Sequence, residues 1–141
     1  DLRPTYDMFF AQIFRPEIYM ETKFLNLMQA LESLHKSKNP EKCSLRKRVN
    51  DLFEGLDDEL KQLVTKEVQK FTDQIINWRN LLTHYHVNSQ GGDVDYEAIH
   101  SAILSLRKFV VILLLKKLKI EDRIIYERIL NSVKWGSFFS S

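Results

Sequence analysis

The feature that most constrains the fold is a row of six apolar residues between positions 64 and 82. Successive members are separated by four, three, four, three and four positions: Val64, Val68, Phe71, Ile75, Trp78 and Leu82. Residues at this spacing lie on one face of an α-helix, because the helix turns once in about 3.6 residues. We therefore expect an amphipathic helix that begins near Asp57-Asp58, where acids stabilise a helix N-terminus, and runs to about His84.

The same periodicity, interrupted by loop-forming residues, predicts four further helices. Asn39-Pro40, Gly55 and the polar loop 88–93 mark helix ends. The expected helices on either side of the 57–84 segment cover residues 16–37, 43–54, 96–119 and 122–133. Period-two alternation, which would indicate strands, does not stand out. The sequence thus predicts an all-α fold, an up-and-down helical bundle of four to five helices with short loops.

A chain of 141 residues with 44% hydrophobic content is long enough for one domain with a single core. We assign residues 16–134 to the helical bundle. Residues 1–15, with Pro4 and several aromatic side chains, are interpreted as an incoming linker that packs onto it, and residues 135–141 as an aromatic C-terminal tail. Because the chain begins with Asp1 rather than Met, we expect it to be part of a larger protein.

Composition argues against several classes of protein. The single cysteine, Cys43, cannot form an internal disulfide, which is typical of an intracellular, cytoplasmic protein. The net charge of +2 does not indicate a general nucleic-acid arm or a polybasic membrane anchor. The apolar run 109–115 is far shorter than the ~20 residues needed to cross a bilayer. We expect a cytoplasmic protein with no membrane partner.

Metal and cofactor chemistry find no support in the motifs. The histidines and Cys43 occur in no H-E-x-x-H, paired Glu-x-x-His or C-x-x-C arrangement. Glycine-rich phosphate loops and the G-x-S-x-G nucleophile elbow are also missing from the sequence. His84 and His86 are two positions apart, so on a helix they point in different directions. We expect neither a metal nor a cofactor.

Polar residues replace the apolar row at the end of the 57–84 helix: Arg79, Asn80, Thr83 and His84, with His86 following. On an ideal helix Asn80 and His84 share a face, whereas Arg79 lies about 140° from His84. Arg79 and His84 converge only if the arginine reaches round the helix, the helix unwinds after Leu82, or a second copy of the domain supplies the opposite half.

These residue types suit the cleavage of RNA without a metal. A histidine, with a reference pKa of about 6.5, can take the proton of a ribose 2′-hydroxyl or give one to the leaving 5′-oxygen. An arginine can bind the scissile phosphate through two hydrogen bonds, and Asn80 can orient the imidazole or hold a phosphate oxygen. The alternative is structural, because Arg and His near a helix C-terminus stabilise the helix dipole whatever the function.

The segment 76–85, Ile-Asn-Trp-Arg-Asn-Leu-Leu-Thr-His-Tyr, resembles the R-x4-H signature of the HEPN superfamily, in which an arginine is followed by a polar residue, often Asn, and then by a histidine. With residues 29–35 on the first helix, the bundle is similar to the HEPN domains of ApeA-like bacterial antiphage proteins. The resemblance implies that Arg79 and His84 are the catalytic pair, that Asn80 is their polar partner, and that two protomers share one site. Glu32 is a candidate supporting acid, and equally a solvated helix residue.

The resemblance also implies a biological role. Many HEPN domains are metal-independent endoribonucleases, so we expect a homodimeric effector domain from a larger antiphage (abortive infection) protein whose N-terminal region senses the trigger. The competing hypothesis is a noncatalytic HEPN-like domain that dimerises, or docks a partner through the apolar 96–119 helix and the aromatic tail.

Single-stranded or tRNA-like RNA is the favoured partner, because exposed bases can stack on aromatic side chains. Further RNA contacts are predicted from residues beside the motif and from one basic cluster: Thr83, Tyr85, His86, Arg46, Lys47 and Arg48. The alternative is that the charged residues are simply a solvated helix face and that Tyr85 belongs to the core.

Overall fold

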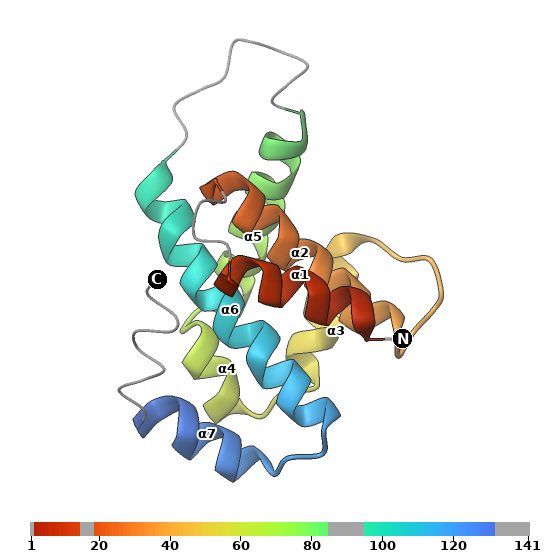
Figure 1. Cartoon of the computed structure of the whole chain (residues 1–141), viewed down its shortest axis with the longest axis vertical. Helices are drawn as coiled ribbons and strands as arrows, with labels where there is room; N and C mark the ends of the chain where they lie inside the picture. The colour runs from red at the N-terminus through yellow and green to blue at the C-terminus, as the bar shows by residue number, and fades with distance from the viewer. Residues whose placement is uncertain (1, 15–18, 85–94, 132–141) are drawn as a thin grey trace.

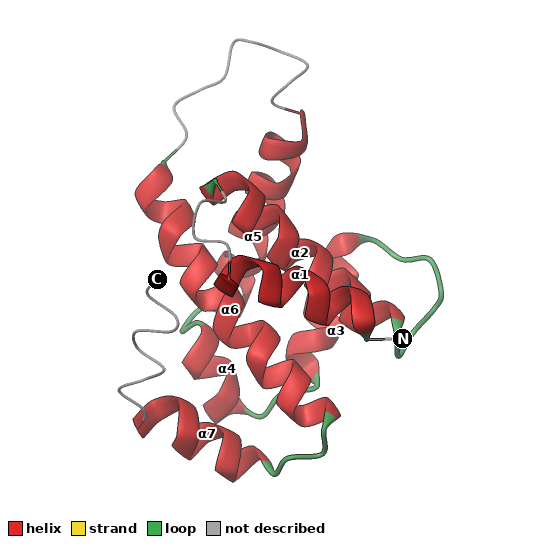
Figure 2. Ribbon diagram, in the orientation of Figure 1, coloured by secondary structure: helices red, strands yellow, loops and turns green. Residues whose placement is uncertain are grey.

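The computed structural model describes residues 2–14, 19–84 and 95–131, with the side chains of residues 11–14 left out. Figures 1 and 2 show an arrangement built from helices throughout these ranges. The seven described helices are α1 (Arg3–Phe14), α2 (Met20–Lys36), α3 (Leu45–Glu54), α4 (Asp58–Val64), α5 (Val68–His84), α6 (Tyr96–Lys117) and α7 (Asp122–Asn131). The predicted all-α class is confirmed, with seven described helices where four to five were predicted.

The central element is α6, which packs against α2, α4 and α7. Its apolar side chains are turned inward, and the ring of Phe109 stacks on Phe53 of α3 with centroids 4.1 Å apart. By length and composition alone α6 could cross a membrane, with a mean hydropathy of 1.9, but 61% of that stretch is buried in the bundle. The core helix of a folded bundle can be equally long and apolar, and α6 occupies such a core position in this structure.

Helices α2 and α5 cross beside α6 and place the motif (Figure 1). Phe24 of α2 is fully buried and meets the ring of Trp78 edge-on, with centroids 6.2 Å apart. Along α5 the apolar row continues through the buried residues Phe71, Ile75 and Leu82. One face of α5 is therefore held in the core, and the opposite face is left to solvent.

The predicted 57–84 helix is two helices. Asp57 caps α4 by accepting a hydrogen bond from the backbone N–H of Leu60 at 2.9 Å, as the sequence suggested. The chain then becomes extended at Thr65 (φ −158°, ψ 150°), and the Thr65 hydroxyl accepts a hydrogen bond from the backbone N–H of Glu67 at 3.2 Å before α5 begins. The spacing did not reveal this break, because Val64 before it and Val68 after it are four positions apart, as in a continuous helix.

Residues 1–15 were predicted as a linker, but most of them form α1. Pro4 lies in the first turn of this helix, where a missing N–H has no partner to lose, so it does not interrupt the helix. Phe9 is buried, and α1 packs along α2. The predicted start of the next helix at Pro16 and the tail 135–141 lie outside the described residues, as does the loop 88–93.

Helix α6 ends two residues before its predicted limit. Lys119 follows α6 in the left-handed region (φ 60°), and the backbone N–H of Ile120 donates to the Leu115 carbonyl at 3.1 Å. This arrangement satisfies carbonyls that a helix C-terminus leaves open, so α6 stops at Lys117. The described part of α7 ends at Asn131.

Candidate functional site

Four of the predicted motif residues lie on the last two turns of α5, which ends at His84. Arg79 is half-buried, whereas Asn80, Thr83 and His84 are exposed. The edge-on contact of Trp78 with Phe24 holds this part of α5 against α2. Tyr85 and His86 lie outside the described residues, so their predicted roles have no structural account.

Arg79 reaches toward α2 and forms an ion pair with Glu32. The guanidinium Nη2 lies 3.9 Å from the Glu32 carboxylate Oε1, and the two side chains are 36% and 23% exposed. A pair this exposed contributes at most about 1 kcal/mol to stability. It places one edge of the Arg79 guanidinium near Glu32, and because a guanidinium has five N–H donors, others remain for a phosphate.

Asn80 and His84 are one helical turn apart and share an exposed face of α5. The Thr83 hydroxyl donates a hydrogen bond to the Arg79 carbonyl, so this proton is not available to a ligand. Within the described ranges, no hydrogen bond or ion pair joins Arg79 to His84. The chain therefore carries both groups on one short segment, and by the geometry of a regular helix they diverge by about 140°.

Two of the predicted RNA-binding cations have carboxylate partners. The guanidinium of the half-exposed Arg46 contacts Asp73 of α5, and its hydrogen bond lowers the pKa of that carboxyl. The Lys47 ammonium lies 2.9 Å from Asp51, whose hydrogen bond raises the pKa of Lys47. Both cations remain on the surface, so a phosphate can compete for them.

The third predicted cation, Arg48, is buried and is not a surface contact for RNA, which corrects the prediction. It is only 7% exposed, and its Nη1 lies 3.1 Å from Nδ1 of His35. Nε2 of His35 lies 2.8 Å from the Asp51 carboxylate, and this hydrogen bond is the main reason for the lowered pKa of Asp51, followed by Lys47. The chain Arg48–His35–Asp51–Lys47 ties α2 to α3.

Sequence reasoning did not find this network, although its signal was present. His35 follows Leu31 by four positions on the buried face of α2, and Arg48 immediately precedes the buried Val49 on α3. Polar residues on an apolar face must find partners inside the protein. Within the part of the chain that the structure describes, no three His, Cys, Asp or Glu side chains form a group able to hold a metal ion.

Comparison with known proteins bears on the motif. A family model described as Apea-like HEPN matches residues 25–124, a span that begins in α2 and ends in α7. It includes Glu32, Arg79, Asn80 and His84. No curated protein and no solved structure matches the chain.

Proposed function

Because the chain belongs to the Apea-like HEPN family, we propose that it is a metal-independent endoribonuclease domain whose active site is shared by two copies of the chain. HEPN domains are generally ribonucleases, and the family is associated with defence functions. The finer assignment is that this domain is the effector part of a larger antiphage protein acting by abortive infection in the cytoplasm.

The observation that carries this proposal is the placement of Arg79 and His84 on the terminal turns of α5. Arg79 is directed toward Glu32 of α2, and His84 is exposed on a different side of the helix. One copy thus offers an imidazole and a guanidinium that diverge by about 140° on a regular helix. A twofold axis near the end of α5 would bring the His84 of one chain toward the Arg79 of its partner.

The proposed reaction uses the ribose as the nucleophile. His84 accepts the proton of the 2′-hydroxyl, the 2′-oxygen bonds to phosphorus, and the bond from phosphorus to the 5′-oxygen breaks with protonation of the leaving oxygen. The products are a 2′,3′-cyclic phosphate and a 5′-hydroxyl. Arg79 binds the nonbridging oxygens, where negative charge builds up, and Asn80 holds a phosphate oxygen or the imidazole. DNA lacks the 2′-hydroxyl and is not cut.

RNA recognition follows from the remaining exposed cations. Arg46 and Lys47 lie on α3, and each is shared between a carboxylate and solvent. Exchanging these weak surface pairs for phosphate contacts would supply affinity that falls with salt concentration. The proposed substrate is single-stranded or tRNA-like RNA, whose splayed bases leave the backbone accessible.

The test is a cleavage assay in the presence of a chelator. Arg79→Ala and His84→Ala are compared with wild-type chain, and Arg128→Ala and His100→Ala serve as matched controls because both residues are exposed on other helices. We expect losses of about 10²–10⁴-fold for His84→Ala and about 10²–10³-fold for Arg79→Ala. Arg79→Lys should not restore full activity, because lysine lacks the planar fork. Equal cleavage by wild-type and both motif variants would refute the assignment.

A noncatalytic docking domain is the second candidate, and one observation favours it. Leu118, Ile120 and Ile124 are 59%, 38% and 47% exposed around the α6–α7 connection. Most apolar side chains of α6 itself are buried in the core, so α6 does not offer the docking face that the sequence predicted. If this connection were the only functional surface, Ile124→Asp would abolish partner binding and Arg79→Ala would have no phenotype in cells.

A further inference from the structure

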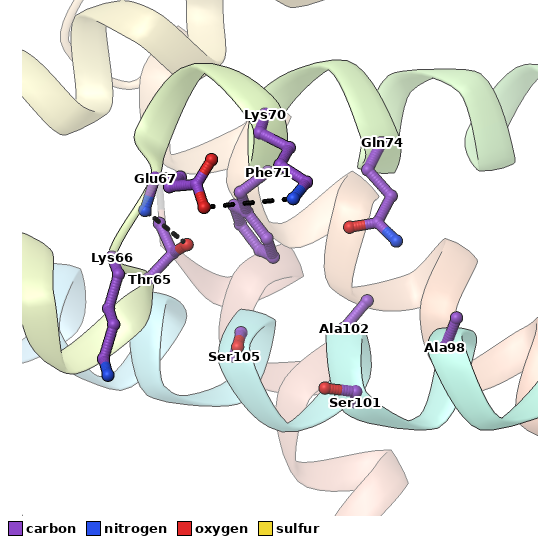
Figure 3. Close-up of a pocket in the computed structure, with 10 residues that line it drawn as sticks. All are labelled: Thr65, Lys66, Glu67, Lys70, Phe71, Gln74, Ala98, Ser101, Ala102 and Ser105. Atoms are coloured by element: carbon purple, nitrogen blue, oxygen red, sulfur yellow. Dashed lines mark hydrogen bonds and ion pairs between the residues drawn. The ribbon is translucent and has the colours of Figure 1, made fainter.

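A cavity of about 310 Å³ lies between α5 and α6, away from the R-x4-H residues. Figure 3 shows its walls: the α4–α5 connection and the first half of α5 on one side, and the first half of α6 on the other. Its size is at the lower end of the range for small-ligand pockets, which suits about one nucleotide. The residues that line it are Thr65, Lys66, Glu67, Lys70, Phe71, Gln74, Ala98, Ser101, Ala102 and Ser105.

The cavity exists because α6 presents only small side chains to this part of α5. Ala98, Ser101, Ala102 and Ser105 recur at helical spacing, so they form a shallow strip that no large side chain fills. Opposite this strip, Phe71 is 7% exposed, and its ring meets Phe53 edge-on at 6.2 Å. The cavity therefore has a fixed aromatic wall and a wall of small polar and methyl groups.

The rim carries charge and hydrogen-bonding groups. Lys70 points to the Glu67 carboxylate, Lys66 points away from both along the α4–α5 connection, and Gln74 points from α5 toward α6 (Figure 3). The Lys70 ammonium is 3.8 Å from the Glu67 carboxylate, with the side chains 76% and 68% exposed. An ion pair this exposed is weak, so a phosphate can replace the carboxylate at Lys70.

An exposed face of α5 leads from the cavity to the motif. Gln74, Asn77, Asn80 and His84 follow one another at spacings of three, three and four, and all four are exposed. Gln74 and His84 are ten residues apart, which is about 15 Å along the helix. Amide side chains both donate and accept hydrogen bonds, so this face offers an RNA strand a series of neutral polar contacts.

We propose that the cavity is a nucleotide-binding subsite for the RNA substrate, one that holds a nucleotide remote from the scissile phosphate. Lys70 contacts its phosphate, its base lies against Phe71 and the Ala98–Ala102 wall, and Gln74 and Ser101 hydrogen-bond to it. The strand continues along Asn77 and Asn80 to His84. This inference depends on the proposed function for its substrate, but the cavity can be tested without any cleavage.

The test measures binding of a fluorescent single-stranded RNA of about ten nucleotides, within the lengths that single-strand binding domains span. All variants carry His84→Ala, so that no RNA is cut and a failure of catalysis leaves the result unaffected. Lys70→Ala should reduce the slope of log K against log salt by about 0.7, the loss of one phosphate contact on a single strand. Lys36→Ala, a lysine at the far end of α2, should not.

Two further variants separate a binding role from a structural one. Glu67→Gln removes the competing carboxylate and should tighten RNA binding. Ser101→Phe fills the cavity from an exposed position and should weaken binding about fivefold or more, the equivalent of one lost stacked base, whereas Ser101→Ala should leave it within twofold. Unfolding in urea confirms that each variant is folded.

NMR of the same His84→Ala protein distinguishes a subsite for an RNA nucleotide from a pocket for a free mononucleotide or phosphate. Addition of the RNA should shift the amide signals of Gln74 and Ser101, and adenosine monophosphate or inorganic phosphate at equal concentration should shift them less. Stronger binding of the free mononucleotide than of RNA would overturn the subsite and indicate a pocket for a soluble nucleotide. Unchanged RNA affinity in Lys70→Ala and Ser101→Phe would overturn it entirely.

Discussion

The buried pair of Arg48 and His35 makes a prediction that can be worked out from the contacts. A guanidinium only donates hydrogen bonds, so Nδ1 of His35 accepts from Arg48 at 3.1 Å and Nε2 donates to Asp51 at 2.8 Å. Arg48 has one further contact, to the Glu41 carbonyl at 3.5 Å. His35 and Arg48 are 2% and 7% exposed, so water cannot easily take the place of either partner.

The two single substitutions should differ in cost. His35→Leu leaves the buried Arg48 cation with only its long contact to the Glu41 carbonyl, which costs about 3 kcal/mol or more because the unsatisfied donor is charged. Arg48→Met removes the cation and leaves only the Nδ1 acceptor unsatisfied, which costs about 1–3 kcal/mol. In the double variant neither a buried charge nor an orphaned acceptor remains, and Asp51 keeps Lys47. The double variant should therefore be more stable than the sum of the single effects predicts, by about 1–3 kcal/mol.

Urea unfolding followed by far-UV circular dichroism measures all four corners of this cycle. With an m-value of about 2 kcal/mol/M, a loss of 4 kcal/mol moves the midpoint by about 2 M. Arg48→Met should also leave the salt dependence of RNA binding unchanged, because a buried arginine contacts no phosphate. Additive single effects, or a smaller cost for His35→Leu than for Arg48→Met, would refute the buried-pair explanation.

Three further predictions concern the shared site, acid stability and the core. Mixing inactive Arg79→Ala and His84→Ala chains should restore part of the RNA cleavage, because a mixed dimer has one intact composite site; no recovery in a mixture shown to exchange subunits would contradict sharing. Because the pKa of Asp51 is lowered in the folded state, its ionised carboxylate contributes fully to stability above the unfolded pKa of about 3.9. This contribution is lost as the pH falls through the lower folded pKa. The urea midpoint of the wild-type protein should therefore fall more between pH 5 and pH 3 than that of Asp51→Asn. Phe53→Ala should destabilise by about 3–5 kcal/mol, because it removes the ring stacked on Phe109, and Phe53→Leu should cost clearly less in the same urea experiment.

Sequence periodicity predicted most of the helices because it is a local property. The apolar row from Val64 to Leu82 needs only the 3.6-residue repeat to indicate which face is buried, and the structure buries Phe71, Ile75 and Leu82. The R-x4-H spelling is also local, and the family that it resembles is the one that the family model matches. Periodicity missed the helix within residues 1–15 and the break that divides 57–84 into two helices. In the first case a proline in the first turn was taken as a helix-avoiding signal, and in the second an extended residue between two valines left the repeat intact.

The all-α class and the position of Arg79, Asn80 and His84 at one helix end could be predicted from the sequence alone, because helix formation and side-chain direction depend on residues within a few turns. Which charged residues are buried depends instead on how the helices pack against one another. Arg46, Lys47 and Arg48 are adjacent in sequence, yet the first two are exposed and the third donates to His35, because the side of α3 that carries Arg48 is the one that packs against α2. The Glu32–Arg79 pair and the α5–α6 cavity likewise arise from packing between segments far apart in the chain, which local periodicity does not encode.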